Sequence, residues 1–198
     1  MKFEIHLDAV VPPECTFEQV KQAFEAQGWD WVQSIPAQEA QFHEEIWVID
    51  GDRGAARGAA RYIRDHFLDL TIIRTESDIY GMVTTLLEQL SAQLPILFID
   101  DLVAMVDSKD PWTRGFALRG LAAITERFDG DTFQALKDAL LESDPQMRGL
   151  ALRCLTRYPW FQFIKVLEEA ASRETVPELR AEQLALIEDI RKHGKRGT

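Results

Sequence analysis

The sequence predicts an α+β domain followed by an all-α array of about three helical hairpins. A phrase that begins at Asp110 returns at Asp144, an offset of 34 residues, and such a period is typical of stacked helical hairpins. Before this repeat, short alternating segments are interspersed with helical patterns, and residues 45–50 are the clearest strand. We therefore expect a small α/β domain over residues 1–76 and a helical repeat domain over residues 77–198.

The first half begins with alternating apolar residues that predict a strand over residues 2–10. Thr16 has the character of a helix cap, and Gly28 closes the helix that follows. The remaining elements are strands at 29–33, 45–50 and 70–74 and an Ala/Arg-rich helix at 53–67. Ser77 then predicts the cap of a further helix that reaches about residue 94.

This order, β-α-β-β-α-β, matches a ferredoxin-like split βαβ arrangement, and a three-stranded variant is the alternative. Four arginines with helical spacing support the helix at 53–67, namely Arg53, Arg57, Arg61 and Arg64. In so acidic a half of the chain, we expect them to pair with Glu and Asp side chains.

The repeated helices begin with local signals. An aspartate side chain accepts hydrogen bonds from free helix N–H groups, and proline at the first helical position loses no bond. Asp110-Pro111 and Asp144-Pro145 provide these signals, and Pro177 begins a degenerate third copy. The partner helices are expected just before each copy, over residues 96–106, 132–142 and 160–171. One hairpin cannot bury its apolar face alone, so stacking is expected to stabilise the array.

The repeated phrase resembles short bacterial HEAT-like repeats of the PBS-lyase type, whose signature is Asp-Pro-x-Val-Arg before an Ala/Leu-rich helix. Asp110, Pro111, Arg114 and Asp144, Pro145, Arg148 match this signature. Thr113 and Met147 replace the valine. The resemblance covers residues 96–193. It implies that Asp110, Arg114, Asp144 and Arg148 form a structural ladder between neighbouring repeats.

The charge of the chain is acidic and unevenly distributed. The net charge is −11, of which residues 1–94 contribute −9 (7 basic and 16 acidic side chains) and residues 95–198 contribute −2 (15 and 17). Such a field repels nucleic acid and attracts a basic protein. We therefore expect a basic protein partner, with acidity that serves solubility alone as the alternative.

Several classes of site are not expected. No apolar run has the length of a membrane span and the N-terminus has no signal-peptide layout, so a cytoplasmic protein is predicted. Cys15 and Cys154 have no redox or metal spacing, and His43 has only adjacent carboxylates beside it. The glycines of residues 51–58 fit neither a P-loop nor a dinucleotide fingerprint. We predict no metal, no cofactor and no enzyme activity.

The candidate binding residues are aromatic, basic or acidic. Trp112 stands in a repeat turn where the second copy has Gln146, and it is either a packing wedge or an exposed anchor. Arg119 and Arg153 recur at equivalent positions of the second helices and are expected to be exposed. The acidic candidates for a basic partner are Glu44, Glu45, Asp50 and Asp52.

These patterns favour a non-enzymatic protein–protein interaction module, because solenoids present a continuous surface to another protein. A specific version resembles a bacterial immunity protein, whose acidic face covers a basic toxin. One alternative is an enzyme or enzyme accessory, because HEAT-like repeats also occur in lyases that attach chromophores to phycobiliproteins. The other is a scaffold or regulatory subunit of a larger complex.

Overall fold

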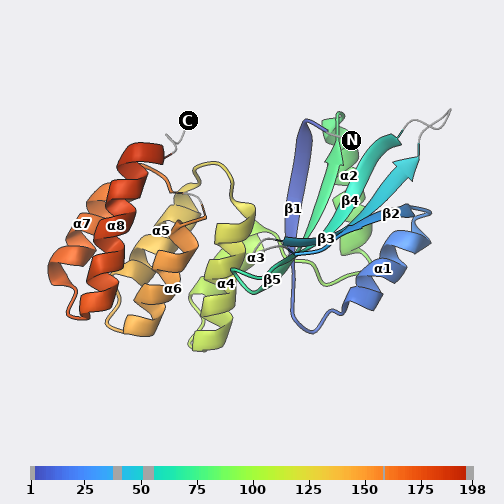
Figure 1. Cartoon of the computed structure of the whole chain (residues 1–198). Coiled ribbons are helices and arrows are strands. Elements are labelled where there is room, and N and C mark those ends of the chain that lie inside the picture. Colours follow the sequence, from blue (N-terminus) through green and yellow to red (C-terminus); the bar gives the residue numbers. More distant parts are fainter. Residues whose placement is uncertain (1–2, 38–41, 51–55, 158, 195–198) are drawn as a thin grey trace. The chain divides into compact units, whose positions relative to one another are not determined.

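The computed structural model describes residues 3–37, 42–50, 56–157 and 159–194. Lys2 of the predicted first strand and the candidate site residue Asp52 lie outside these ranges. The chain divides into two compact units, Met1–Phe98 and Ile99–Thr198, and each is described by itself (Figure 1). None of the described helices combines the length and the apolar character that crossing a membrane requires.

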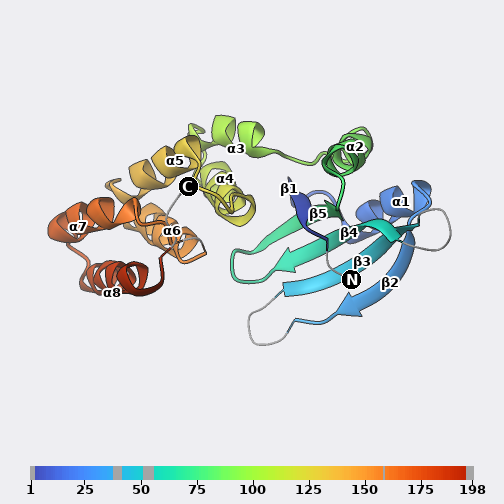
Figure 2. The ribbon, with the colours of Figure 1, turned by 90° about the horizontal axis from the view of Figure 1, so that it is seen from above.

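Within its described residues, the first unit contains a five-stranded antiparallel sheet with the strand order β1-β5-β4-β3-β2. Its elements are β1 (Ile5–Val11), α1 (Phe17–Ala26), β2 (Asp30–Ile35), β3 (Phe42–Asp50), β4 (Ala56–Asp65), β5 (Leu70–Ser77) and α2 (Tyr80–Ser91). Helices α1 and α2 cover the same face of the sheet (Figure 2). Phe24 of α1 and Trp47 of β3 are fully buried between the layers, with ring centroids 4.8 Å apart.

The predicted helix over residues 53–67 is wrong where the structure describes it, because Ala56–Asp65 forms strand β4, and residues 53–55 lie outside the described ranges. This strand lies between β3 and β5 and pairs with both along most of its length. Pairing on two sides outweighs the intrinsic helix preference of alanine and arginine. Because side chains alternate between the two faces of a strand, Ala60 and Tyr62 lie in the helix-covered core. Arg61 lies on the other face, where it pairs with Glu44 and Glu76. The topology is therefore neither ferredoxin-like nor three-stranded.

Two local features fix the β4–β5 hairpin. The buried carboxylate of Asp65 accepts hydrogen bonds from the backbone N–H groups of Phe67 (2.9 Å) and Leu68 (3.0 Å) and closes the turn. Asp69 follows with a φ of 54°, in the left-handed region that aspartate tolerates. At the other end, a Cβ on Gly58 would lie 2.7 Å from the carbonyl oxygen of Glu76, so the strands approach this closely because the residue is glycine.

The prediction of helical hairpins in the C-terminal half is confirmed. The described part of the second unit contains three hairpins, α3 (Ile99–Val106) with α4 (Pro111–Ile124), α5 (Gly130–Leu140) with α6 (Pro145–Leu155), and α7 (Phe163–Arg173) with α8 (Pro177–His193). The first helices, α3, α5 and α7, contact one another in sequence, and so do the second helices, α4, α6 and α8 (Figure 1). The array therefore has two helical layers.

The repeated Asp-Pro pairs begin the second helices as their chemistry requires. Asp110 accepts hydrogen bonds from the backbone N–H (2.9 Å) and hydroxyl (2.6 Å) of Thr113, and these bonds lower the pKa of Asp110. Asp144 accepts one from the N–H of Gln146 (2.9 Å). The third copy has Val176 at the cap position and makes no side-chain cap bond.

Candidate functional site

Arg114 connects the first hairpin to the second. Its Nε donates to the carbonyl oxygen of Val106 at the end of α3 (3.0 Å), and its guanidinium pairs with Glu142 after α5. The hydrogen bonds to Glu142 raise the pKa of Arg114, and Asp107 and Asp144 add to this effect.

Arg148 repeats the arrangement between the second and third hairpins. Its Nη1 donates to the carbonyl oxygens of Glu142 (2.9 Å) and Ser143 (2.8 Å) at the end of α5. Its Nε and Nη2 donate to the two carboxylate oxygens of Glu174 (2.7 and 2.6 Å), which follows α7. A bidentate pair of this kind fixes both the distance and the orientation between neighbouring hairpins.

The structure therefore places the four ladder candidates in two roles. Asp110 and Asp144 cap their own helices, whereas Arg114 and Arg148 reach the next hairpin. The carboxylate partners are two glutamates that sequence reasoning missed. Glu142 follows the first helix of its hairpin, and Glu174 follows the first helix of the next hairpin. The two glutamates lie 32 residues apart, and this recurrence was the signal that could have identified them.

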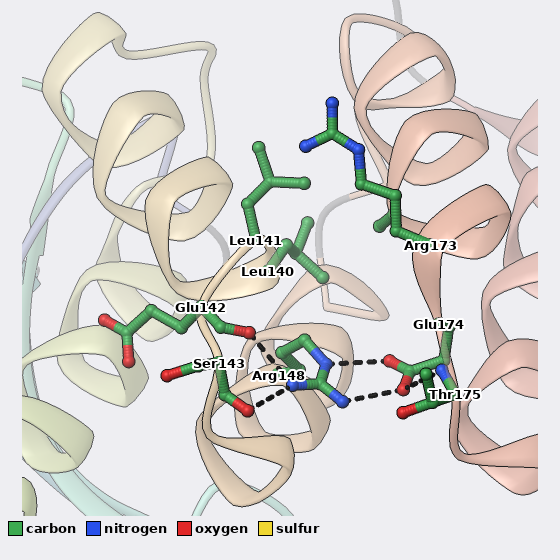
Figure 3. A pocket seen from close by; sticks show the side chains of 9 residues that line it. Leu140, Leu141, Glu142, Ser143, Arg148, Arg173, Glu174 and Thr175 are labelled. Atoms are coloured by element: carbon green, nitrogen blue, oxygen red, sulfur yellow. Dashed lines mark hydrogen bonds and ion pairs between the residues drawn. The ribbon is translucent and has the colours of Figure 1, made fainter.

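A cavity of about 220 Å³ lies beside Arg148 (Figure 3). Its lining combines the end of α5 with the α7–α8 turn, and includes Leu140, Leu141, Arg173 and Thr175. Hydrogen bonds from Arg148 lower the pKa of Glu174 to about 2, although burial opposes this, and the N–H groups of Val176 and Thr175 add to the lowering. A carboxylate with so low a pKa holds no proton to donate at neutral pH and is a weak base. The pair of Arg148 and Glu174 therefore joins the two hairpins rather than moving a proton.

Trp112 occupies the first turn of α4. Its ring stacks on that of Phe116, with centroids 5.7 Å apart and planes at 9°. Phe116 is buried, yet Trp112 remains 57% exposed. The indole is thus held on one face and presented to solvent on the rest of its surface.

Arg119 of α4 and Arg153 of α6 both act electrostatically on the buried Cys154 of α6. Burial raises the pKa of Cys154 to about 12, and the electrostatic influence of Arg119 and Arg153 opposes this only partly. The thiol is therefore protonated and unreactive at neutral pH. Arg153 is exposed, whereas Arg119 is half-buried.

The acidic candidates of the first unit lie on different faces of the sheet. Glu45 shares the helix-covered face with Trp47, and it accepts hydrogen bonds from Trp31 Nε1 (2.8 Å) and Ser34 Oγ (2.7 Å). A third hydrogen bond joins Glu45 to His43 Nε2 (2.8 Å). Burial raises the pKa of Glu45, but these bonds outweigh it and lower the pKa overall.

Glu44 lies on the opposite face, where Arg61 Nη1 donates to it at 2.9 Å. Asp50 is the last residue of β3. The structure therefore does not bring Glu44 and Glu45 together into one acidic patch, because successive residues of a strand point to opposite faces. Trp31 of β2 was not among the candidate binding residues, although its side chain is 53% exposed.

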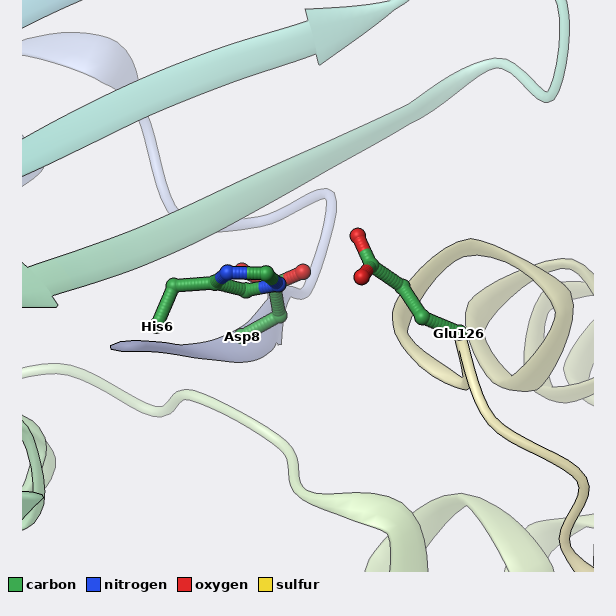
Figure 4. A group of neighbouring side chains, drawn as sticks. All are labelled: His6, Asp8 and Glu126. Carbon is green, nitrogen blue, oxygen red and sulfur yellow. The ribbon is translucent and has the colours of Figure 1, made fainter. Parts of the chain in front are cut away.

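Figure 4 shows His6 and Asp8 on β1 and Glu126 after α4. Asp8 is engaged within the first unit, where Arg74 donates to it from Nη2 (2.7 Å) and Nε (2.8 Å). Strand β1 belongs to the first unit, and Glu126 belongs to the second.

Comparison of the chain with known proteins leaves its function to be inferred from the geometry described above. Neither the family models, nor the curated proteins, nor the solved structures include a match to the chain.

Proposed function

We propose that this chain is a non-enzymatic protein-binding protein whose HEAT-like helical array anchors its partner at Trp112. The single observation that carries the proposal is the state of this indole, stacked on Phe116 and yet 57% exposed. Tryptophan and arginine are enriched among residues that dominate binding energy at interfaces. A ring that is already fixed loses little conformational entropy when a partner covers it.

The HEAT-like character of the array is part of the same proposal. It is supported by the recurring Asp-Pro caps and by the arginine that connects each hairpin to the next. Arrays of this kind present one side of their helices as a continuous surface. Arg153, exposed on α6, is the basic candidate of that surface.

The partner is proposed to be a basic protein, and the narrower version is a toxin that this chain inhibits as an immunity-type protein. Residues 1–94 carry a net charge of −9. Arginines neutralise several acids on the sheet, but Glu14, which precedes α1, and Glu18, in its first turn, are exposed. Opposite charge would accelerate association and make it depend on salt.

The test is an affinity purification from the source cell with three tagged chains, namely wild type, Trp112→Ala and the control Leu184→Ala. Leu184 is a half-exposed apolar residue of the same unit. We expect wild type and Leu184→Ala to retain one basic protein. Trp112→Ala should weaken its binding by roughly a hundredfold, the loss of about 2–3 kcal/mol typical of an interface anchor.

Three results would redirect the proposal. Equal binding by all three chains would remove Trp112 as the anchor. Several proteins recovered together would favour a scaffold. Failure to recover any protein would count against protein binding, and a spectral shift with a bilin would then favour the chromophore-lyase alternative. Circular dichroism of each variant shows whether the fold is retained.

A further inference from the structure

Strand β2 is an open edge of the sheet. All six of its residues are exposed, and among the described residues it pairs with β3 alone. The opposite edge is different, because Val10 of β1 exchanges two backbone hydrogen bonds with Leu97 (2.9 and 2.8 Å). An edge with free N–H and C=O groups is a template for a further strand, and natural proteins usually protect it.

The side chains of β2 are unusually apolar for such an edge. Trp31 is 53% exposed and Val32 is 52% exposed, and Ile35 is also among the exposed large hydrophobic residues. The protective devices of edge strands are weak here. The sequence Asp-Trp-Val-Gln-Ser-Ile contains no lysine, arginine or proline, and the protection consists of one irregularity of register between Trp31 and Gln33.

Trp31 is exposed but held in place. Its Nε1 donates to Glu45 on the neighbouring strand at 2.8 Å, and Ser34 of the same edge donates to the other oxygen of that carboxylate at 2.7 Å. The indole orientation is therefore set before any partner arrives. Pre-organised aromatic surface of this kind favours binding because little side-chain freedom remains to be lost.

We propose that β2 accepts an extended, basic segment of a partner protein by strand addition. Backbone hydrogen bonds to the free edge would supply affinity, and alternate side chains would select for an apolar residue beside Trp31. The charge of the partner follows from Asp30, the one charged residue of the strand, and from the net charge of −9 over residues 1–94. The same acidity disfavours a second copy of this chain, because two like-charged units would meet.

This inference goes beyond the proposed role of Trp112, which lies on the other unit. Either can fail without the other, because strand addition is tested at β2 and the array anchor at Trp112.

The experiment selects binders to the full-length wild-type chain from a displayed random-peptide library. The recovered peptides are then measured against wild type, Val32→Lys and the control Ile79→Lys. Ile79 lies in the same unit, is 61% exposed and undergoes the same change of charge. We expect peptides that alternate Lys or Arg with β-branched or aromatic residues. Lysine on an edge strand blocks pairing, so Val32→Lys should bind them roughly tenfold more weakly than Ile79→Lys.

Hydrogen exchange of the wild-type complex provides a readout that needs no variant. Bound peptide should slow exchange of the β2 amides while leaving those of β1 unchanged. The proposal is overturned if no such peptides are enriched, if protection appears away from β2, or if the two lysine variants bind equally. Concentration-dependent self-association of wild type that Val32→Lys abolishes would identify a second copy as the occupant instead.

Discussion

Consecutive hairpins of the described helical array meet at two junctions that use the same residue types at different depths. At the first junction, Arg114 pairs with Glu142, whose side chain is 27% exposed. At the second, Arg148 pairs with Glu174, whose side chain is 0% exposed. Arg148 also donates to two backbone carbonyls, whereas Arg114 donates to one.

The difference indicates that one sequence motif can produce ion pairs that contribute unequally to the free energy of unfolding. An exposed ion pair contributes little because water competes with it, and removal of its partner leaves a charge that water can solvate. A buried pair has a large cost of desolvation, so removal of one partner leaves the other charge uncompensated. The second junction should therefore be much more sensitive than the first to loss of its carboxylate.

The largest effect is expected for Glu174→Ala. Removal of this carboxylate leaves Arg148, 12% exposed, without its charged partner, and should cost about 3–5 kcal/mol of unfolding free energy. The matched variant Glu142→Ala should cost about 1 kcal/mol or less, because its pair is partly solvated. Urea denaturation followed by circular dichroism measures both. Equal losses would show that burial does not distinguish the two junctions.

Equivalent leucines of the second helices give the next largest effect. Leu152 of α6 is buried, and Leu184 occupies the equivalent position of α8, where it is half-exposed. Leu152→Ala should destabilise the protein by about 2–5 kcal/mol through the cavity it leaves. Leu184→Ala should change stability by about 0.5 kcal/mol at most. Thermal and urea unfolding of the pair tests this, and a large cost at Leu184 would indicate that its side chain is covered.

Acid should weaken the second junction. The folded pKa of Glu174, about 2, lies below its ordinary value of 4.5. The pair therefore contributes its full stability above about pH 5, and this contribution is lost as the pH falls toward 2. In Glu174→Gln, the amide that replaces the carboxylate does not titrate over this pH range. The difference in unfolding free energy between wild type and this variant should shrink by on the order of 2 kcal/mol over that range. A difference that stays constant with pH would contradict the assignment.

The helical half was predictable because its signals are local. An Asp-Pro pair caps the helix that it precedes, so Asp110 and Asp144 could be placed without knowledge of the tertiary structure. Strand β4 was not predictable in this way. Alanine and arginine favour a helix locally, and pairing with β3 on one side and with β5 on the other makes the segment extended.

The residues of the candidate site also differ in how far local sequence could predict them. Arg114 and Arg148 belong to the repeated phrase and were identified, whereas Glu142 and Glu174 lie outside it and were missed, although they recur 32 residues apart. The exposure of Trp31 depends on strand order, because it follows from the position of β2 at the edge of the sheet. An aromatic residue in a predicted strand does not reveal which strand has a free edge.

The smallest effect concerns the glycines that let second helices approach each other. A Cβ on Gly115 would lie 3.1 Å from Leu150 Cδ2 at the first junction, and a Cβ on Gly149 would lie 3.3 Å from Leu179 Cδ2 at the second. Alanine in a helix gains up to about 1 kcal/mol over glycine, and a flexible leucine methyl must move by a few tenths of an ångström to admit it.

We expect Gly149→Ala to stabilise the array by about 0.5 kcal/mol and Gly115→Ala to be close to neutral, because its contact is tighter. Paired urea titrations measure the difference. If both substitutions instead cost more than about 1 kcal/mol, the second-helix layer is packed too rigidly for Leu150 and Leu179 to adjust. The two junctions would then differ in their ion pairs but not in their apolar packing.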